Sequence, residues 1–125
     1  MTIQEAITRA DEKRPNMVLM SEKVRALNEI DGLIHAEILM KHAHTAAEET
    51  PPAYDDATDP ATELLIPAPY DKLYIDWLCC EIDDRNQEMD KYNNDRSMFE
   101  NHYQLMADWV NRSRMPIGAA REVRI

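Results

Sequence analysis

The fold is decided by residues 70–113, which read YDKLYIDWLCCEIDDRNQEMDKYNNDRSMFENHYQLMADWVNRS. Apolar residues recur there every three or four positions, the period of an α-helix with one buried face. The pattern predicts one helix over residues 70–86 and a second over residues 88–113. Asn86 is expected to end the first helix in the left-handed conformation, which asparagine tolerates better than most residues. Because the break is so short, the helices are expected to form a long C-terminal antiparallel hairpin.

The helix over residues 88–113 carries more apolar surface than one partner helix covers. One ridge is expected to pack on the preceding helix, with Trp77 and Phe99 buried between the two. A second ridge lies beside it and consists of Met98, Leu105 and Trp109. Exposed apolar surface of this kind marks contact sites, so the second ridge is a candidate interface between copies of the chain.

Two further helices are predicted before this hairpin. The first spans residues 2–14 and opens with Thr2 and Glu5 at the spacing of a capping box. The second spans residues 21–43, and Ser21 is its expected N-cap. A chain of 125 residues has the length of one domain. We therefore expect a single all-α domain, residues 1–125, with about four helices.

Residues 45–69 differ from the rest of the chain. They include five of the seven prolines and six acidic residues, with no lysine or arginine. Such a length without a helical period is unusual for a simple connection, so a long Pro-rich acidic loop with a role in assembly is expected. The apolar triplet at its end is Leu64, Leu65 and Ile66, which favours extended backbone. Its side chains would alternate between the chain's own helices and a neighbouring copy.

The C-terminal end is basic. Residues 111–125 contain four arginines and one glutamate, a charge of 4 − 1 = +3, in a chain of net charge −10. The arginines are Arg112, Arg114, Arg121 and Arg124. Charge complementarity favours contact between the acidic loop of one copy and the basic end of the next. The alternative is a flexible surface loop and a flexible tail over residues 116–125.

Composition argues against several classes of protein. The net charge of −10 disfavours wrapping of nucleic acid and docking on an anionic membrane. The two glycines, Gly32 and Gly118, are too far apart for a phosphate-binding loop. No apolar stretch is long enough to span a membrane, and the first residues do not resemble a secretory signal, so a cytoplasmic site of synthesis is expected. Cys79 and Cys80 are adjacent and are not expected to form a disulfide.

No set of residues with the spacing of a catalytic, cofactor or metal site is present. His35 and His42 are seven residues apart, about 10.5 Å along a helix, too far to share one zinc ion. With His44 they are interpreted as surface histidines near a fraying helix end. The carboxylates are interpreted as a solvated acidic face. The sequence therefore predicts no catalytic residue, no cofactor and no metal.

Residues 62–78, TELLIPAPYDKLYIDWL, resemble the small head–tail connector (adaptor) proteins of tailed bacteriophages. Residues 81–104, EIDDRNQEMDKYNNDRSMFENHYQ, are similar to the same family, with a helix, a short turn and a long helix that begins with asparagines and aromatics. The opening residues 1–16 also look like the first helix of these proteins. Residues 43–59 carry none of the resemblance.

The resemblance implies a non-enzymatic structural part of the virion, assembled in the cytoplasm of a bacterial host. Copies would form a homo-oligomeric ring beneath the portal protein, contact tail-side connector proteins and extend the DNA channel. DNA would be passing cargo, because an acidic channel wall repels the phosphate backbone. The alternative is a small acidic helical regulatory or antitoxin-like binding protein. Size in solution at high concentration discriminates between the two.

Overall fold

The computed structural model describes residues 1–117, which contain four α-helices and no β-strand. The α-helices are α1 (Ile3–Lys13), α2 (Met20–Glu37), α3 (Leu73–Arg85) and α4 (Met89–Ser113). Short 3₁₀ helices cover η1 (Leu39–Lys41), η2 (Ala46–Glu49) and η3 (Tyr70–Lys72). None of the described helices is long and apolar enough to cross a membrane. The predicted all-α class is confirmed.

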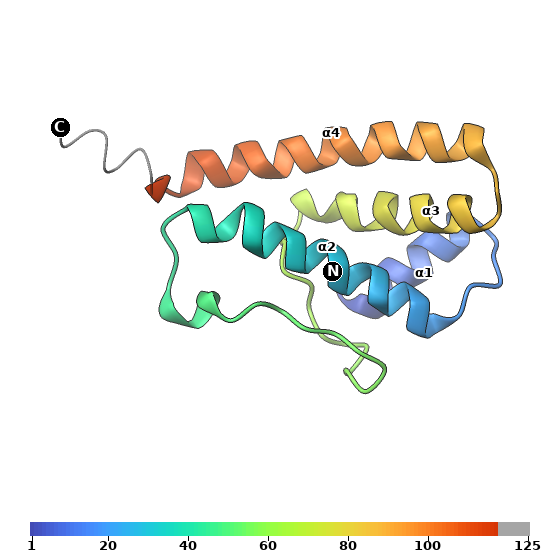
Figure 1. The fold of residues 1–125 in the computed structure, drawn as a ribbon, viewed down its shortest axis with the longest axis horizontal. Coiled ribbons are helices and arrows are strands. Elements are labelled where there is room, and N and C mark those ends of the chain that lie inside the picture. The colour runs from blue at the N-terminus through green and yellow to red at the C-terminus, as the bar shows by residue number, and fades with distance from the viewer. Residues whose placement is uncertain (118–125) are drawn as a thin grey trace.

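Helix α3 is the centre of the fold, because it packs against α1, α2 and α4 (Figure 1). It is apolar on most of its circumference, and its buried apolar side chains are Leu73, Tyr74, Leu78, Cys79, Cys80 and Ile82. The facing side of α4 contributes Phe99, Met106 and Val110 to the same core. A helix that is apolar nearly all round is stable only when other helices cover it, which explains its central place.

Helix α1 begins as its sequence predicts. The Thr2 hydroxyl oxygen accepts a hydrogen bond from the Glu5 backbone N–H at 3.1 Å, which caps the first turn. The buried face of α1 consists of Ile3, Ala6, Ile7 and Ala10. This spacing of three and four residues places the face against α3.

Helix α2 differs from the prediction at both ends. It begins at Met20 with Leu19 as the N-cap residue, so Ser21 does not cap it. It ends at Glu37 instead of continuing to residue 43. The His42 ring lies 2.7 Å from the Ile38 carbonyl oxygen and so occupies an acceptor that a longer helix would use. The other ring nitrogen lies 2.7 Å from Asn111 Oδ1 of α4, a tertiary contact that holds the ring in this place.

The connection between α3 and α4 also corrects a prediction. Asn86 has a right-handed conformation with φ −83°, and the left-handed residue is Gln87 with φ 58°. The Glu88 N–H donates to the Asp83 carbonyl oxygen at 2.9 Å, a bond across the end of α3 that is typical of a helix closed by a left-handed residue. The two helices then lie side by side (Figure 1).

A buried carboxylate joins the segment before α3 to the helices. Asp31 of α2 accepts hydrogen bonds from the hydroxyls of Tyr54 and Tyr74, both at 2.5 Å, and from the Leu65 N–H at 3.0 Å. Burial raises the pKa of Asp31, although the two hydroxyls oppose the rise.

The sequence analysis did not predict the capping box between Thr45 and Glu48, which closes the start of the 3₁₀ helix η2.

Candidate interaction surfaces

The apolar ridge on α4 is uncovered at two of its three positions. Met98 is 42% exposed and Leu105 is 55% exposed. Trp109 is half-buried, because its ring stacks on Tyr70 with centroids 4.8 Å apart and an interplanar angle of 14°. Arg112 donates to the Tyr70 hydroxyl at 3.4 Å. The free part of the ridge is therefore Met98 and Leu105, with Arg112 beyond its end.

A groove between α2 and α4 was not anticipated from the sequence. It is a pocket of about 390 Å³. Its lining residues are Leu33, Trp77, Arg96, Phe99, Glu100, Tyr103 and Gln104. Leu33 on α2 is 46% exposed, because it lies outside the buried stripe that contains Ile30 and Ile34. An apolar residue off the stripe was the one sequence signal that could have indicated this groove.

Aromatic rings form the floor of the groove. Phe99 lies between Trp77 and Tyr103, with ring centroids 5.0 Å and 5.6 Å away. The Trp77 Nε1–H donates to the Ala26 carbonyl oxygen at 2.8 Å, which fixes the indole beneath α2. Phe99 is buried as predicted, but Trp77 is only half-buried, since one of its faces lines the groove.

The ridge and the groove lie on opposite sides of α4. Met98 is two residues from Arg96 and from Glu100, both of which line the groove. Two residues along an α-helix correspond to a rotation of about 200°. One side of α4 therefore presents an apolar ridge, and the other side forms one wall of an apolar groove.

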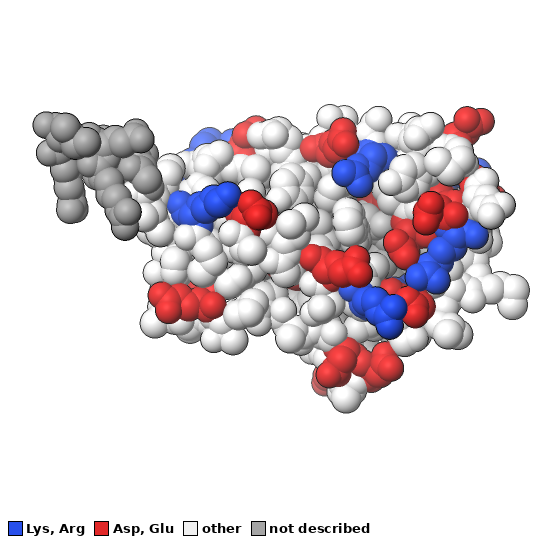
Figure 2. All heavy atoms as spheres, viewed as in Figure 1, with Lys and Arg blue, Asp and Glu red and all other residues white. Residues whose placement is uncertain are grey.

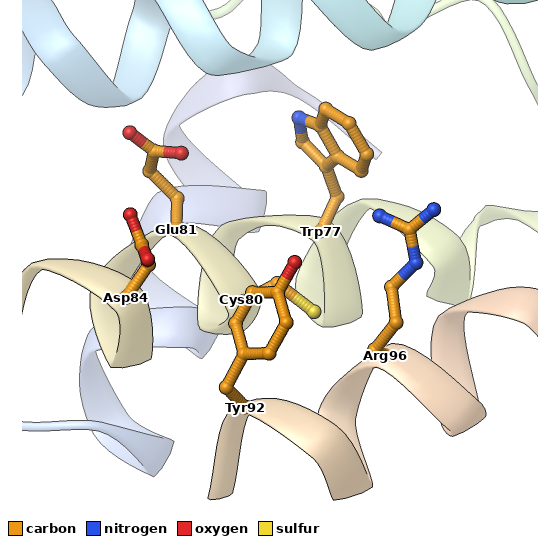
Figure 3. A pocket seen from close by; sticks show the side chains of 6 residues that line it. All are labelled: Trp77, Cys80, Glu81, Asp84, Tyr92 and Arg96. Carbon is orange, nitrogen blue, oxygen red and sulfur yellow. The ribbon is translucent and has the colours of Figure 1, made fainter. Parts of the chain in front are cut away.

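A smaller pocket of about 170 Å³ continues the groove along α3 (Figure 3). Its lining combines aromatic, acidic and basic side chains with one thiol: Trp77, Cys80, Glu81, Asp84, Tyr92 and Arg96. Burial raises the pKa of the Cys80 thiol to about 12, so the thiol is protonated at neutral pH. The same cause raises the pKa of Cys79 to about 12. Neither cysteine has the character of a nucleophile.

The predicted interface triplet is mostly inside the molecule. Leu64 and Ile66 are 5% and 2% exposed and belong to the core. Leu65 is half-buried, and its N–H is bound by Asp31. The alternation of an extended segment explains why its two neighbours point inward. Of the three, only Leu65 has surface to offer another copy.

The sequence predicts a contact between the acidic segment 45–69 of one copy and the basic end of the next. In the structure, a contact between these two segments forms within a single chain. Arg114 Nη2 donates to Glu48 Oε2 at 2.8 Å, and Nη1 donates to the Ala43 carbonyl oxygen at 3.4 Å. The hydrogen bond from Arg114 lowers the pKa of Glu48 to about 2. Arg114 was predicted to reach a neighbouring copy, and its partner here is intramolecular. Arg121 and Arg124 lie outside the described residues.

The histidines are less exposed than expected. His42 is 7% exposed, and its two ring nitrogens lie 2.7 Å from the Ile38 carbonyl oxygen and from Asn111 Oδ1. His35 is 6% exposed, with Nε2 2.7 Å from the Glu48 carbonyl oxygen. The interpretation as surface histidines was wrong for both, because partners distant in sequence cover them. Within residues 1–117, no group of three His, Cys, Asp or Glu side chains is arranged to hold a metal ion.

Comparisons with known proteins found no relative of this chain. No family model matches the chain. No curated protein and no solved structure matches it either. The two sides of α4 are therefore interpreted from their own chemistry.

Proposed function

We propose that the protein is a structural component of a tailed-bacteriophage virion, a head–tail connector that forms a ring beneath the portal and extends the DNA channel. The resemblance of residues 62–78 and 81–104 to this family supports the proposal, as does the all-α fold. In this proposal the chain acts as one domain without enzymatic activity. The antiparallel hairpin of α3 and α4 is the element that carries the ring contacts.

The observation that carries the proposal is the opposition of ridge and groove across α4. A closed ring needs a heterologous contact, in which one surface of a copy meets a different surface of the next. Met98 and Leu105 of one copy would pack into the groove lined by Leu33, Trp77 and Tyr103 of its neighbour. Because the two surfaces lie on opposite sides, each copy can contact two neighbours at once.

The acidic net charge of the chain supports the proposal that it forms part of the wall of a DNA channel. The chain has 24 acidic and 14 basic residues, and carboxylates stand out at several places on the face in Figure 2. A wall of this sign repels DNA phosphates, so DNA slides along it instead of binding. The acidic segment 45–69 and the basic end with Arg112, Arg121 and Arg124 would add contacts between copies, with Leu65 as the apolar member.

The test is the oligomeric state of the purified protein, alone and with the portal protein of the same phage, by native mass spectrometry and electron microscopy. Leu105→Asp on the ridge and Leu33→Asp in the groove should each abolish rings and leave helicity unchanged, because both side chains are about half exposed. A mixture of the two variants should yield pairs, since one intact ridge then meets one intact groove. Met115→Asp is the matched control, at a residue 64% exposed and outside both surfaces.

A chain that remains monomeric at high concentration and in the presence of the portal would overturn the proposal. That result would favour the alternative, a small acidic helical regulatory or antitoxin-like protein. Rings that persist in both variants would show that other surfaces make the contact.

A further inference from the structure

A histidine lies within the apolar ridge of α4. His102 is four residues after Met98 and three before Leu105, a spacing that places side chains on one side of a helix. The residues one turn before and after it on α4 are all apolar: Met98, Phe99, Leu105 and Met106. His102 therefore brings hydrogen-bonding atoms to a surface that is otherwise apolar along this part of the helix.

A buried carboxylate fixes the ring of His102. Its Nδ1–H donates to Oδ2 of Asp76 in α3, a residue that is 4% exposed, and the His102 side chain itself is 21% exposed. Nε2 has no hydrogen-bond partner among residues 1–117. It reaches solvent, because Asp83 Oδ2 is the only fully buried side-chain oxygen or nitrogen of these residues without a partner. In a protonated ring, Nε2–H is a donor that a second molecule can bind.

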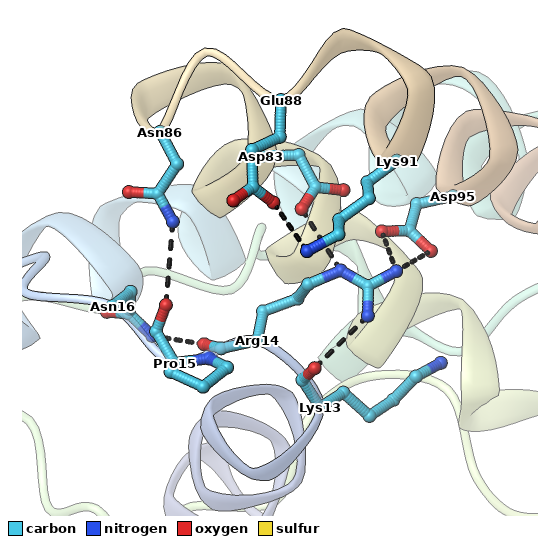
Figure 4. A network of polar contacts seen from close by, with 9 residues as sticks. All are labelled: Lys13, Arg14, Pro15, Asn16, Asp83, Asn86, Glu88, Lys91 and Asp95. Carbon is cyan, nitrogen blue, oxygen red and sulfur yellow. Dashed lines mark hydrogen bonds and ion pairs between the residues drawn. The ribbon is translucent and has the colours of Figure 1, made fainter.

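The other carboxylates along α4 are not placed to bind Nε2 of His102 in the same chain. Asp95 is buried in the polar network of Figure 4. Glu100 lines the groove on the other side of α4. Asp90 and Asp108 are each rotated from His102 by about 120° around the helix. A carboxylate that binds Nε2 therefore has to come from another molecule.

The exposed charges around the ridge are mainly positive. Lys72 and Arg112 have no ion-pair partner among residues 1–117, and both are exposed. Lys91 pairs with Glu88 at 2.9 Å, which leaves no net charge there (Figure 4). The acidic residues beside Lys72 bind the amino group at the start of α1, at 3.1 and 3.5 Å: Asp71 and Glu63. Two unpaired cations favour a partner surface with free carboxylates.

The α2 edge of the groove carries such carboxylates. Glu29 and Glu37 lie four residues before and after Leu33, so the three exposed residues share one side of α2. Burial raises the pKa of Tyr103, and the charge of Glu37 raises it further, which places Glu37 close to the groove lining.

The neighbouring charges leave this edge negative. Glu37 pairs with Lys41 at 3.0 Å, and Glu100 pairs with Arg96 at 3.3 Å. The charged residues toward the start of α2 and the end of α3 balance one another: Glu22, Arg25, Glu81 and Arg85. Glu29 has no ion-pair partner among residues 1–117, and the pair of Glu37 is exposed, so solvent keeps it weak.

The ridge and the α2 edge also match in spacing. His102 is about 6 Å from Met98 along α4. Glu29 and Glu37 are each about 6 Å from Leu33 along α2. When either exposed ridge residue of one copy packs on Leu33 of the next, His102 lies opposite one of the two glutamates, for either direction of the helices.

We propose that His102 Nε2–H of one copy donates to Glu29 or Glu37 of the next copy, and that this hydrogen bond orients the ridge in the groove. The inference rests on the proposed function, because the same ridge and groove form the ring contact there. Two ridges packed on each other would bring Lys72 and Arg112 of both copies together, so charge favours a groove as the partner of a ridge.

The experiment uses the pair formed by the Leu33→Asp and Leu105→Asp variants, in which a single ridge meets a single groove. His102→Asn is placed in the Leu33→Asp chain, whose ridge is intact. Glu29→Gln or Glu37→Gln is placed in the Leu105→Asp chain, whose groove is intact. Asparagine puts an N–H near the position of Nδ1, so it keeps the bond to the buried carboxylate of α3 and removes Nε2. Analytical ultracentrifugation gives the dissociation constant of each pair.

We expect His102→Asn to weaken the pair about tenfold, and one of the two glutamine variants to weaken it equally. Combining these two changes should weaken the pair no further, since both remove the same hydrogen bond. The other glutamine variant should bind like the parent pair, as should the control Glu12→Gln, at an exposed carboxylate of α1 outside both surfaces. The melting temperature of each chain should be unchanged.

Unchanged affinity in His102→Asn, or effects that add fully in the combined variants, overturns this inference and leaves the contact between ridge and groove standing. If His102→Asn lowers the melting temperature, Glu29→Lys and Glu37→Lys decide in its place, because both positions are exposed. One of them should weaken the pair more than its glutamine variant does, and unchanged affinity in both overturns the inference.

The parent pair separates this inference from the proposed function. A parent pair that does not form, while the wild type forms rings, overturns the contact between ridge and groove and this inference with it. A wild type that stays monomeric, alone and with the portal protein, overturns the proposed function itself.

Discussion

Arg14 donates from Nε to Asp83 Oδ1 at 3.1 Å, while Oδ2 of the same carboxylate is buried and has no hydrogen-bond partner among the described residues. Asp95 occupies the other side of the guanidinium, so two buried carboxylates share one cation. Burial, and then the neighbouring Asp95, raise the pKa of Asp83 to about 6.

This arrangement predicts that mild acid stabilises the fold. The pKa of Asp83 is higher in the folded protein than its ordinary value of 3.8, so folded Asp83 holds a proton that the unfolded chain has released. The free energy of unfolding should therefore gain about 1–2 kcal/mol from this group as pH falls from 7.5 to 5. Urea unfolding at the two pH values measures the change.

Asp83→Asn should stabilise the protein at pH 7.5 by about 1 kcal/mol, because it removes the second buried charge and leaves Arg14 paired with Asp95. It should also flatten the pH dependence between 5 and 7.5. Asp84→Asn, at the exposed neighbouring position, is the control and should do neither. A loss of stability in Asp83→Asn at both pH values would contradict the assignment.

Asp31→Leu should detach the segment before α3. Leucine leaves the Leu65 N–H and the hydroxyls of Tyr54 and Tyr74 without their acceptor, and each unpaired donor is expected to cost about 1–3 kcal/mol. Tyr54→Phe removes a single bond and should cost about 1 kcal/mol. Limited proteolysis should cut residues 50–62 faster in Asp31→Leu, and at the wild-type rate in the exposed control Asp56→Ala.

Phe99→Ala should be more damaging than Trp77→Ala. Phe99 is 6% exposed and contacts two other rings, so its truncation should cost about 3–5 kcal/mol. Trp77 is half-buried in the groove, and its truncation should cost less than that of Phe99. Chemical denaturation of both variants gives the order, and the reverse order would mean that the groove is closed in solution.

Glu48 and Arg114 should contribute to the free energy of unfolding as one interacting pair. Because the pKa of Glu48 is lowered to about 2, its contribution is present at neutral pH and is lost as pH falls below the ordinary carboxyl range. Both side chains are about one-third exposed, so solvent limits the pair to about 0.5–1 kcal/mol. Glu48→Gln, Arg114→Gln and the double variant should therefore have nearly equal unfolding free energies at pH 7.

Local patterns in the sequence were enough to predict the all-α class, from repeats of three and four residues, and the start of α1, from Thr2 and Glu5. They were not enough to predict the end of α2, because the His42 ring that contacts the Ile38 carbonyl oxygen is held by Asn111, 69 residues further along the chain. Nor did they distinguish Gln87 from Asn86 as the left-handed residue, since the bond from the Glu88 N–H decides that position.

The candidate surfaces likewise include some that the sequence predicts and some that it does not. The sequence predicts Met98 and Leu105 as an extra ridge, because they fall outside the face that one partner helix covers. The groove requires knowledge of how far α2 stands from α4, which no local pattern contains.

The ion pair between Arg14 and Asp95 also bears on synthesis at the ribosome. The two residues are 81 positions apart, so a chain growing at 5–20 residues per second takes roughly 4–16 s to supply the carboxylate after the arginine has been made. The apolar face of α1 packs on α3, which is also synthesised late. Helix α1 therefore cannot complete its contacts until α3 and Asp95 have left the ribosome.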